Sequence, residues 1–302
     1  MSTLLDMLAS PLMQRALIAA VLVGLVAPVM GTYLVQRRLA LLGDGIGHMA
    51  LTGVAMGWLV GGALDLTPHD ALAVPGAVVA SIVGAVLIEV VRERGRTSGD
   101  LALALLFYGG IAGGVLLIGI AGGTTANLNG YLFGSIASVT LTDLWLTIAL
   151  AVAILTVGVG LRPALFALSH DEEFARASGL PVRLLNVVVA VVAALTVSVA
   201  MRVVGVLLVS ALMIVPVATA QLVTRSFRAT MALAMGIGVT VSVAGLSVTY
   251  VHPLSPGATI VVLAIGAFGV VSLARPLLGR RRPAADPHPD VQDDVELVRE
   301  AP

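Results

Sequence analysis

The sequence contains neither cysteine nor lysine among its 302 residues. The absence of cysteine excludes disulfides, thiol catalysis and cysteine-based zinc sites. The absence of lysine excludes a phosphate-binding loop of the GxxxxGK[ST] type, because its lysine contacts the nucleotide phosphates. If ATP hydrolysis drives this protein, a separate chain must carry it out.

Charge is also scarce, since charged residues make up 11% of the chain and hydrophobic residues 58%. Soluble domains carry about 25% charged residues, so this chain cannot cover a water-facing surface and is expected to lie in lipid. The formal net charge is zero, and no basic run indicates nucleic-acid binding. The N-terminal segment lacks the pattern of a cleaved signal peptide. The chain also lacks a recognisable catalytic motif, so no enzyme is predicted.

Nine apolar segments are long enough to cross a membrane. They lie near residues 14–36, 39–63, 69–91, 100–121, 141–161, 183–201, 203–224, 229–250 and 257–275. Pro216 interrupts the segment 203–224, which could instead be a half-helix, and eight crossings are then the alternative. The sequence predicts an all-α, polytopic integral membrane protein with about nine, and at least eight, transmembrane helices.

Arginine-rich loops follow every second predicted segment. Because positive charge stays cytoplasmic, nine crossings place the N-terminus outside and the C-terminus inside a plasma-membrane protein. Residues 1–279 form the expected transmembrane domain. Residues 280–302 are charged, contain proline and have few apolar side chains, and therefore predict a disordered cytoplasmic tail.

The longest cytoplasmic loop predicts a short helix over about residues 170–179. Ser169 with Glu172 fits a capping box, and three consecutive acids suit the positive end of a helix dipole. A helix resting on lipid headgroups is usually basic, so docking to a protein is favoured over a simple loop helix. The residues expected to serve this docking are Asp171, Glu172, Glu173, Phe174, Ala177 and Gly179.

Asp44 and His48 stand four residues apart in an apolar stretch. On a helix they share one face and can reach a common ligand, and a carboxylate with an imidazole suits Zn²⁺, Mn²⁺ or Fe²⁺. An ionisable residue within a span costs about 2.5–3.5 kcal/mol, which makes a functional role the default hypothesis. The alternative is that the two side chains pair with each other or with the backbone and only fix helix packing.

Glycines flank this pair in two patterns. Gly43, Gly45 and Gly47 alternate, which disfavours a continuous helix and predicts a local break. The later glycines at 53, 57 and 61 have the spacing of four that allows close packing against another helix.

Polar side chains also occur at the predicted ends of two spans. Asp65, His69 and Asp70 could form an outer metal entry, and the alternative is an ordinary solvated loop. Glu89 lies three residues before Arg92 and predicts a structural ion pair.

The longest motif is the stretch 37–57, RRLALLGDGIGHMALTGVAMG. Four shorter stretches are YLFG (131–134), ARASGLPV (175–182), AMRVVGVLLVSALMIVP (200–216) and SPGATIVVL (255–263). Together they resemble one family, the zinc/manganese ABC transporter permeases of the ZnuB, MntB and TroC type, whose RR…GD…H…LxGVAxG block is similar to residues 37–57. These matches follow one another in order over roughly residues 20–275.

The resemblance implies the permease subunit of an ABC importer for a divalent transition metal, with zinc as the first expectation and manganese or iron as alternatives. Two copies would form a homodimer, pair with two cytoplasmic ATPase subunits and receive metal from an extracytoplasmic metal-binding protein. Asp44 and His48 match the family's aspartate and histidine on the metal path. The helix at 170–179 would be the coupling helix that docks on the ATPase.

No tightly bound cofactor is expected, because Zn²⁺, Mn²⁺ or Fe²⁺ would be the transported substrate. The alternative function is an ATP-independent secondary transporter or channel. It would need membrane-embedded acids that couple to H⁺ or Na⁺. Asp44 and Glu89 are the candidates, and the acidic inner helix would then have no evident role.

Overall fold

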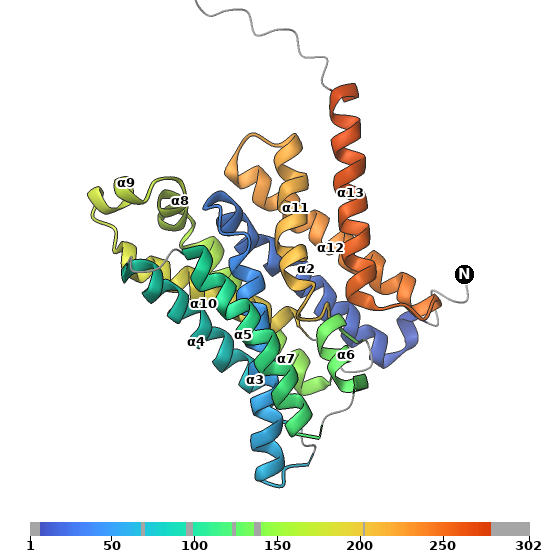
Figure 1. Ribbon diagram of the computed structural model, residues 1–302. Helices are drawn as coiled ribbons and strands as arrows, with labels where there is room; N and C mark the ends of the chain where they lie inside the picture. The colour runs from blue at the N-terminus through green and yellow to red at the C-terminus, as the bar shows by residue number, and fades with distance from the viewer. Residues whose placement is uncertain are drawn as a thin grey trace, which may run out of the picture.

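The computed structural model describes residues 7–67, 70–94, 99–122, 125–135, 140–201 and 203–278. Within these ranges every regular element is a helix, which confirms the all-α prediction. In chain order they are α2 (Pro11–Gln36), α3 (Leu42–Ala63), α4 (Ala73–Arg94), α5 (Gly99–Ile120), α6 (Thr125–Phe133), α7 (Leu141–Gly160), α8 (Arg162–His170), α9 (Glu172–Ala177), α10 (Val182–Ala200), α11 (Val209–Val223), α12 (Phe227–Val251) and α13 (Pro256–Leu278) (Figure 1). The predicted tail, 280–302, lies outside the described residues.

Eight helices in the described part of the chain are long and apolar enough to cross a membrane, and α11, with 15 residues, is shorter. The predicted range of eight to nine spans is therefore confirmed. The break in the weak segment lies at its start, in the non-helical stretch 203–208, and not at Pro216, which is inside α11. Gly205 explains this position, because its φ of 89° is left-handed and ends a helix readily.

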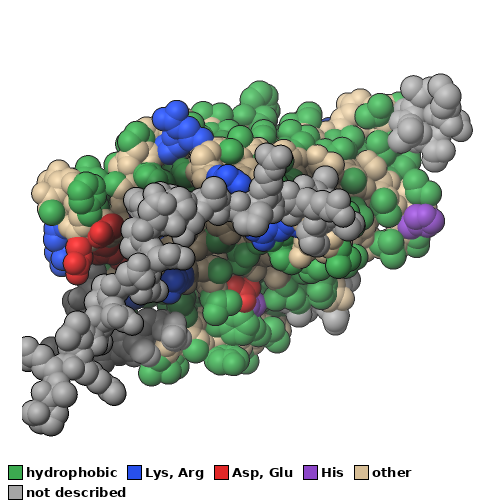
Figure 2. Space-filling view, turned by 90° about the horizontal axis from the view of Figure 1, so that it is seen from above, with side chains coloured by type: hydrophobic (Ala, Val, Ile, Leu, Met, Phe, Trp, Pro, Cys, Tyr) green, Lys and Arg blue, Asp and Glu red, His purple; other side chains and the backbone are tan. Residues whose placement is uncertain are grey.

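The arginine-rich loops predicted from the sequence lie at one end of the helical bundle. The α8–α9 segment, the turn between α11 and α12 and the C-terminal end of α13 all lie toward this end (Figure 1). Figure 2, a view onto it, shows arginine side chains among hydrophobic ones, with acidic side chains at one edge and near the middle. The end with α8 and α9 is hereafter called the arginine end.

Glycines allow α3 to pack tightly between α4 and α5. A Cβ on Gly53 would overlap the carbonyl oxygen of Gly76 in α4, and one on Gly57 would overlap that of Leu72. On the other side, a Cβ on Gly110 of α5 would meet the backbone of His48. The close packing predicted from the four-residue spacing is thus confirmed for Gly53 and Gly57.

The predicted helix break at residues 43–47 is wrong, because α3 runs without interruption from Leu42. Two physical reasons outweigh the low helix propensity of glycine. Backbone groups in an apolar bundle must bond internally, and the glycines bring neighbouring segments close. Gly43 faces Met213 of α11, and Gly47 faces the carbonyl of Val206.

A second backbone junction joins α6 to the stretch 203–208 and to the start of α13. The amides of Val206 and Leu207 donate to the carbonyls of Tyr131 and Leu132, at 2.9 and 3.2 Å. The segments approach so closely that a Cβ would overlap a facing carbonyl at each of three glycines, Gly134, Gly205 and Gly257. We call this contact the three-glycine junction.

Candidate functional site

Asp44 and His48 lie in the first two turns of α3, on one face, as predicted. His48 Nε2 is 4.0 Å from Asp44 Oδ1, which is too long for a hydrogen bond. The Asp44 side chain is 27% exposed, whereas that of His48 is only 2% exposed. The pair therefore does not satisfy itself, and Asp44 is its accessible member.

Ser210 is the residue that sequence reasoning missed. Its hydroxyl donates to Asp44 Oδ1 at 3.1 Å, and it is the second residue of α11. A carboxylate is favoured near the N-terminal end of a helix, so α11 stabilises Asp44 through this bond and through its orientation. The irregular stretch 203–208 delivers Ser210 to α3.

His48 is enclosed by α5. Its ring lies edge-on to Phe107, with centroids 4.2 Å apart and planes at 77°. Its Nδ1 is buried and has no hydrogen-bond partner in the structure. Buried polar atoms are nearly always bonded, so an unbonded ring nitrogen in a pair that does not close on itself marks a group with unused binding capacity.

No group of three or more histidine, aspartate or glutamate side chains is arranged to hold a metal ion within the described ranges. One chain thus contributes a carboxylate, an imidazole and a neighbouring hydroxyl at this site. A divalent transition metal takes at least four ligands. The site as one chain presents it is therefore incomplete for tight metal binding.

The predicted outer entry is only partly described. Asp65 is exposed and has a φ of 50°, and Asp70 accepts a 3.5 Å hydrogen bond from the Tyr131 hydroxyl of α6. His69 lies outside the described residues. Asp70 is thus tied to α6, while Asp65 points its charge at the surroundings.

The predicted cytoplasmic helix exists, but it is shorter than residues 170–179 and has a different cap. It is α9, a six-residue helix whose N-cap is Asp171, which accepts a 2.9 Å bond from the amide of Phe174. The capping box with Ser169 is wrong, because Ser169 lies inside α8 and its hydroxyl bonds to the Leu165 carbonyl at 2.7 Å. Burial of apolar side chains extends α8 to His170, so the chain turns only at the next residue.

The surface of α9 carries most of the residues assigned to docking. Phe174 is 63% exposed, which is unusual for a large aromatic side chain at a polar helix. The exposed members of the predicted set are Asp171, Glu173, Phe174, Ala177 and Gly179. Gly179 has a φ of 79°, the left-handed conformation in which glycine commonly ends a helix.

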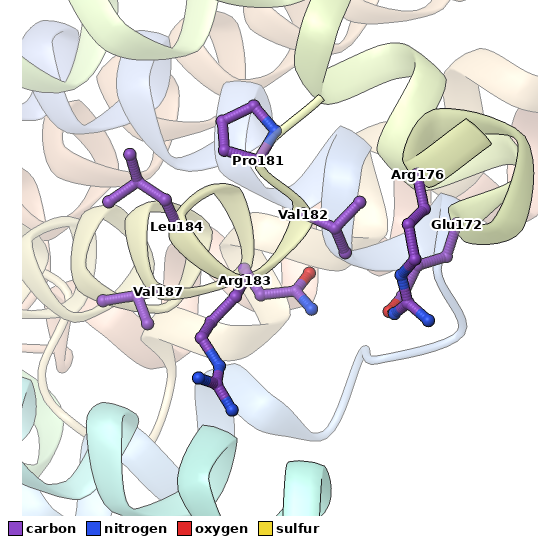
Figure 3. Close-up of a pocket in the computed structure, with 8 residues that line it drawn as sticks. Glu172, Arg176, Pro181, Val182, Arg183, Leu184 and Val187 are labelled. Carbon is purple, nitrogen blue, oxygen red and sulfur yellow. The ribbon is translucent and has the colours of Figure 1, made fainter. Parts of the chain in front are cut away.

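A groove of about 930 Å³ separates α9 from the start of α10 (Figure 3). Glu172 and Arg176 lie on its α9 side and form an ion pair at 3.3 Å. Arg183 and Asn186 line the α10 side. The six-residue helix α9 is thus separated from the start of α10 by a groove with charged side chains on both sides.

The predicted pair of Glu89 and Arg92 is confirmed, with Nη1 and Oε2 3.0 Å apart and Glu89 5% exposed. A carboxylate held by a neighbouring guanidinium is already compensated. Glu89 is therefore accounted for as one half of a structural ion pair.

The chain matches the model of the ABC 3 transport family over residues 9–275. It is 32% identical over 267 residues to the manganese transport system membrane protein MntC of Halalkalibacterium halodurans, covering 88% of each chain. It is 31% identical over 276 residues to the manganese import system permease protein ScaB of Streptococcus parasanguinis, covering 91% of this chain and 95% of ScaB.

Solved structures give the same picture. PsaBC from Streptococcus pneumoniae, in complex with Fab, superposes with a TM-score of 0.78 at 31% identity, covering 89% of this chain and 94% of the other. A putative metal-chelate type ABC transporter in an inward-facing conformation has a TM-score of 0.64 at 16% identity, which speaks for the fold alone. The chain belongs to the ABC 3 transport family and is a multi-span membrane permease of an ABC transporter.

Proposed function

We propose that this chain is the permease subunit of a plasma-membrane importer for Mn²⁺, and that the metal passes Asp44 and His48. The observation that carries the proposal is the half-satisfied pair, with an accessible carboxylate one helical turn from an imidazole whose Nδ1 is unbonded. Oxygen donors suit Mn²⁺, and the named relatives are manganese transport proteins. Manganese therefore replaces zinc as the preferred substrate.

The metal path is proposed to lie between two copies of the chain. One chain offers two ionisable donors and one hydroxyl, and a second copy doubles this set without creating a closed cage. A transport site must bind its ion loosely enough to release it. Each copy also supplies one α9, and two such helices match a motor of two ATPase subunits.

The direction of transport follows from the arginine end, which we place in the cytoplasm by the positive-inside rule. The N-terminus is then outside and the C-terminus inside. Metal from an extracytoplasmic binding protein enters near Asp65, His69 and Asp70, meets Asp44 and His48, and leaves toward the cytoplasm. The ATPase acts through the exposed surface of α9, with Phe174 as the apolar contact.

The test is uptake of radioactive manganese by cells of the native host in which the chromosomal copy carries Asp44→Asn. The amide keeps the shape of Asp44 and its contact with Ser210, but removes the charge that attracts a divalent cation. Outer-shell changes around metals cost roughly 10–100-fold, so uptake should fall by about 100-fold or more. The amount of chain in the membrane and its co-purification with the ATPase should stay unchanged.

Ser81→Ala is the matched control, because it removes a buried hydroxyl between α4 and α10 that bonds to Ser198 at 3.0 Å. Its uptake should stay within about twofold of the wild type, as expected for one neutral hydrogen bond of about 1 kcal/mol. Normal uptake by Asp44→Asn would remove the pair from the path. Gradient-driven manganese flux through the chain alone in liposomes would favour the ATP-independent alternative.

A further inference from the structure

The last residues of α2 make two side-chain contacts with the α8–α9 segment. Arg37, which directly follows α2, places Nη2 3.5 Å from Glu172 Oε2 of α9. Gln36 Nε2 lies 3.3 Å from His170 Nδ1, at the end of α8. The two contacts flank Asp171, the cap of α9, so this short helix is held to α2 on both sides of its first turn.

Arg37 is unusual for an arginine at a helix end, because its side chain is only 6% exposed. Nη2 also donates to Asn186 Oδ1 of α10 at 2.8 Å. Burial lowers the pKa of Arg37, and Arg92 lowers it further, while Glu89 and Glu172 oppose the shift. A buried guanidinium is kept only where several partners compensate for its lost hydration.

The contacts of Arg37 lead toward Asp44 by two routes. Along the chain, Arg37 is followed after a short corner by α3, whose first turn holds Asp44. Across the bundle, its partner Asn186 lies on α10, which leads through 203–208 to Ser210, the residue bonded to Asp44. Arg37 is thus joined to α3 through the short corner and to α10 through Asn186, and α11, which carries Ser210, follows α10 along the chain.

The remaining attachment of α9 is slight. It packs against α8 and α10, and Ala175 is its buried residue. A groove lies between α9 and the start of α10, with Glu172 and Arg176 on its α9 side (Figure 3). Besides its chain connections to α8 and α10, α9 is joined to the end of α2 by the ion pair of Glu172 with Arg37.

We propose that Arg37 is a positioning residue for transport: it links the movement of α9 to α3 and α10, and so to the carboxylate of Asp44. This inference rests on the proposed function, in which α9 receives the ATPase. Arg37 itself does not bind metal, and with a side chain that is only 6% exposed it does not dock the ATPase. Its loss should leave the complex assembled and the metal site intact, but should separate ATP hydrolysis from metal movement.

The experiment is a double-mutant cycle in cells of the native host, with Arg37→Gln, Glu172→Gln and both together. Two quantities are measured: manganese uptake per amount of chain, and ATP hydrolysed per manganese ion imported. Each single variant should lower manganese uptake by about tenfold and raise the number of ATP molecules hydrolysed per ion. The double variant should import at least as much manganese as the single variant with the lower uptake. A purely structural role would not change the ATP cost.

Two further variants make the cycle decisive. Arg38→Gln removes the neighbouring exposed guanidinium, for which the described residues show no ion pair, and it should leave the ATP cost per ion unchanged. Glu172→Asp keeps the charge on a shorter stem and should recover part of the uptake lost in Glu172→Gln. This variant also covers the case in which Arg37→Gln fails to fold.

The link would be overturned if the fold reductions in manganese uptake of the two single variants multiplied in the double variant. It would also be overturned if the reduced uptake were matched by a smaller amount of chain in the membrane or by less ATPase co-purifying with it. The same experiment separates this result from the proposed function. If the wild-type chain imports no manganese, the proposed function fails. If it imports manganese and the cycle is multiplicative, only the role of Arg37 fails.

Discussion

Two polar clusters flank the corner between α2 and α3, and they differ in how completely they are bonded. At the arginine end, the Arg37 guanidinium meets a carboxylate and an amide oxygen and is almost fully enclosed. Seven residues further on, Asp44 has one hydroxyl partner and partial exposure, and His48 keeps an unbonded nitrogen. The first cluster resembles a structural joint, and the second a site with unused capacity.

The difference teaches how to separate charges that join helices from charges that can bind an ion in a membrane bundle. An unsatisfied buried polar group costs about 1–3 kcal/mol, so it persists only where something else compensates for it or where it serves a ligand that comes and goes. A satisfied group of the same type needs no such explanation. The comparison can be tested by removing single groups from each cluster.

His48→Gln should have the largest effect of these tests. Glutamine keeps a polar group of similar length but replaces the imidazole, which is the better ligand for a transition metal. Substitutions of groups around a bound metal lower affinity or activity by roughly 10–100-fold. We therefore expect manganese uptake to fall by about 100-fold. The measurement is initial uptake at saturating manganese, normalised to the amount of chain in the membrane.

Thr52→Val is the control, because Thr52 lies one turn further along α3 and donates to the Gly110 carbonyl at 2.8 Å. It removes a bond between the same two helices without touching the pair, so uptake should stay within about threefold, as for one hydrogen bond. If both variants lose uptake equally, helix packing and not the imidazole explains the effect, and the contrast between the clusters collapses.

Ser210→Ala should have an intermediate effect. The carboxylate of Asp44 remains but loses the hydrogen bond that orients it, as in the outer shell of a metal site. We expect the manganese concentration for half-maximal uptake to rise by about tenfold, with little change in the maximal rate. A change in the maximal rate alone would assign Ser210 to the movement of α11 and not to the orientation of Asp44.

Combined Asp65→Asn and Asp70→Asn substitutions should have the smallest effect. Exposed charges attract a cation over a distance and are screened within about 8 Å at physiological ionic strength. Uptake at limiting manganese should fall by about two- to threefold in low salt, and this loss should disappear at higher salt. A loss of uptake that does not depend on salt would indicate that Asp65 or Asp70 binds the metal directly. The loop would then belong with Asp44 and His48 to the metal-binding groups.

Much of this architecture could be predicted because it depends on local sequence. Hydropathy located the spans, the four-residue spacing placed Asp44 and His48 on one face, and the acidic run marked α9. The missed features depend on contacts between distant residues. Ser210 lies 166 residues from Asp44, and Asn186 lies 149 residues from Arg37.

Two of the local predictions fail for one reason. The break at the glycines 43–47 follows from helix propensity and the cap at Ser169 from a capping-box pattern, and in both places packing decides. Close neighbours kept α3 helical through its glycines, and buried leucines carried α8 past Ser169. Tertiary contacts outweigh propensities of less than about 1 kcal/mol per residue.

The three-glycine junction has a consequence for how the path above Asp44 can open. Where two backbones pack directly against each other, no side chain lies between them whose rotation could make room for sliding. The stretch that delivers Ser210 is therefore locked to α6 and to the start of α13. A motion that withdraws the serine hydroxyl from the carboxylate would therefore have to carry the stretch 203–208, α6 and the start of α13 together.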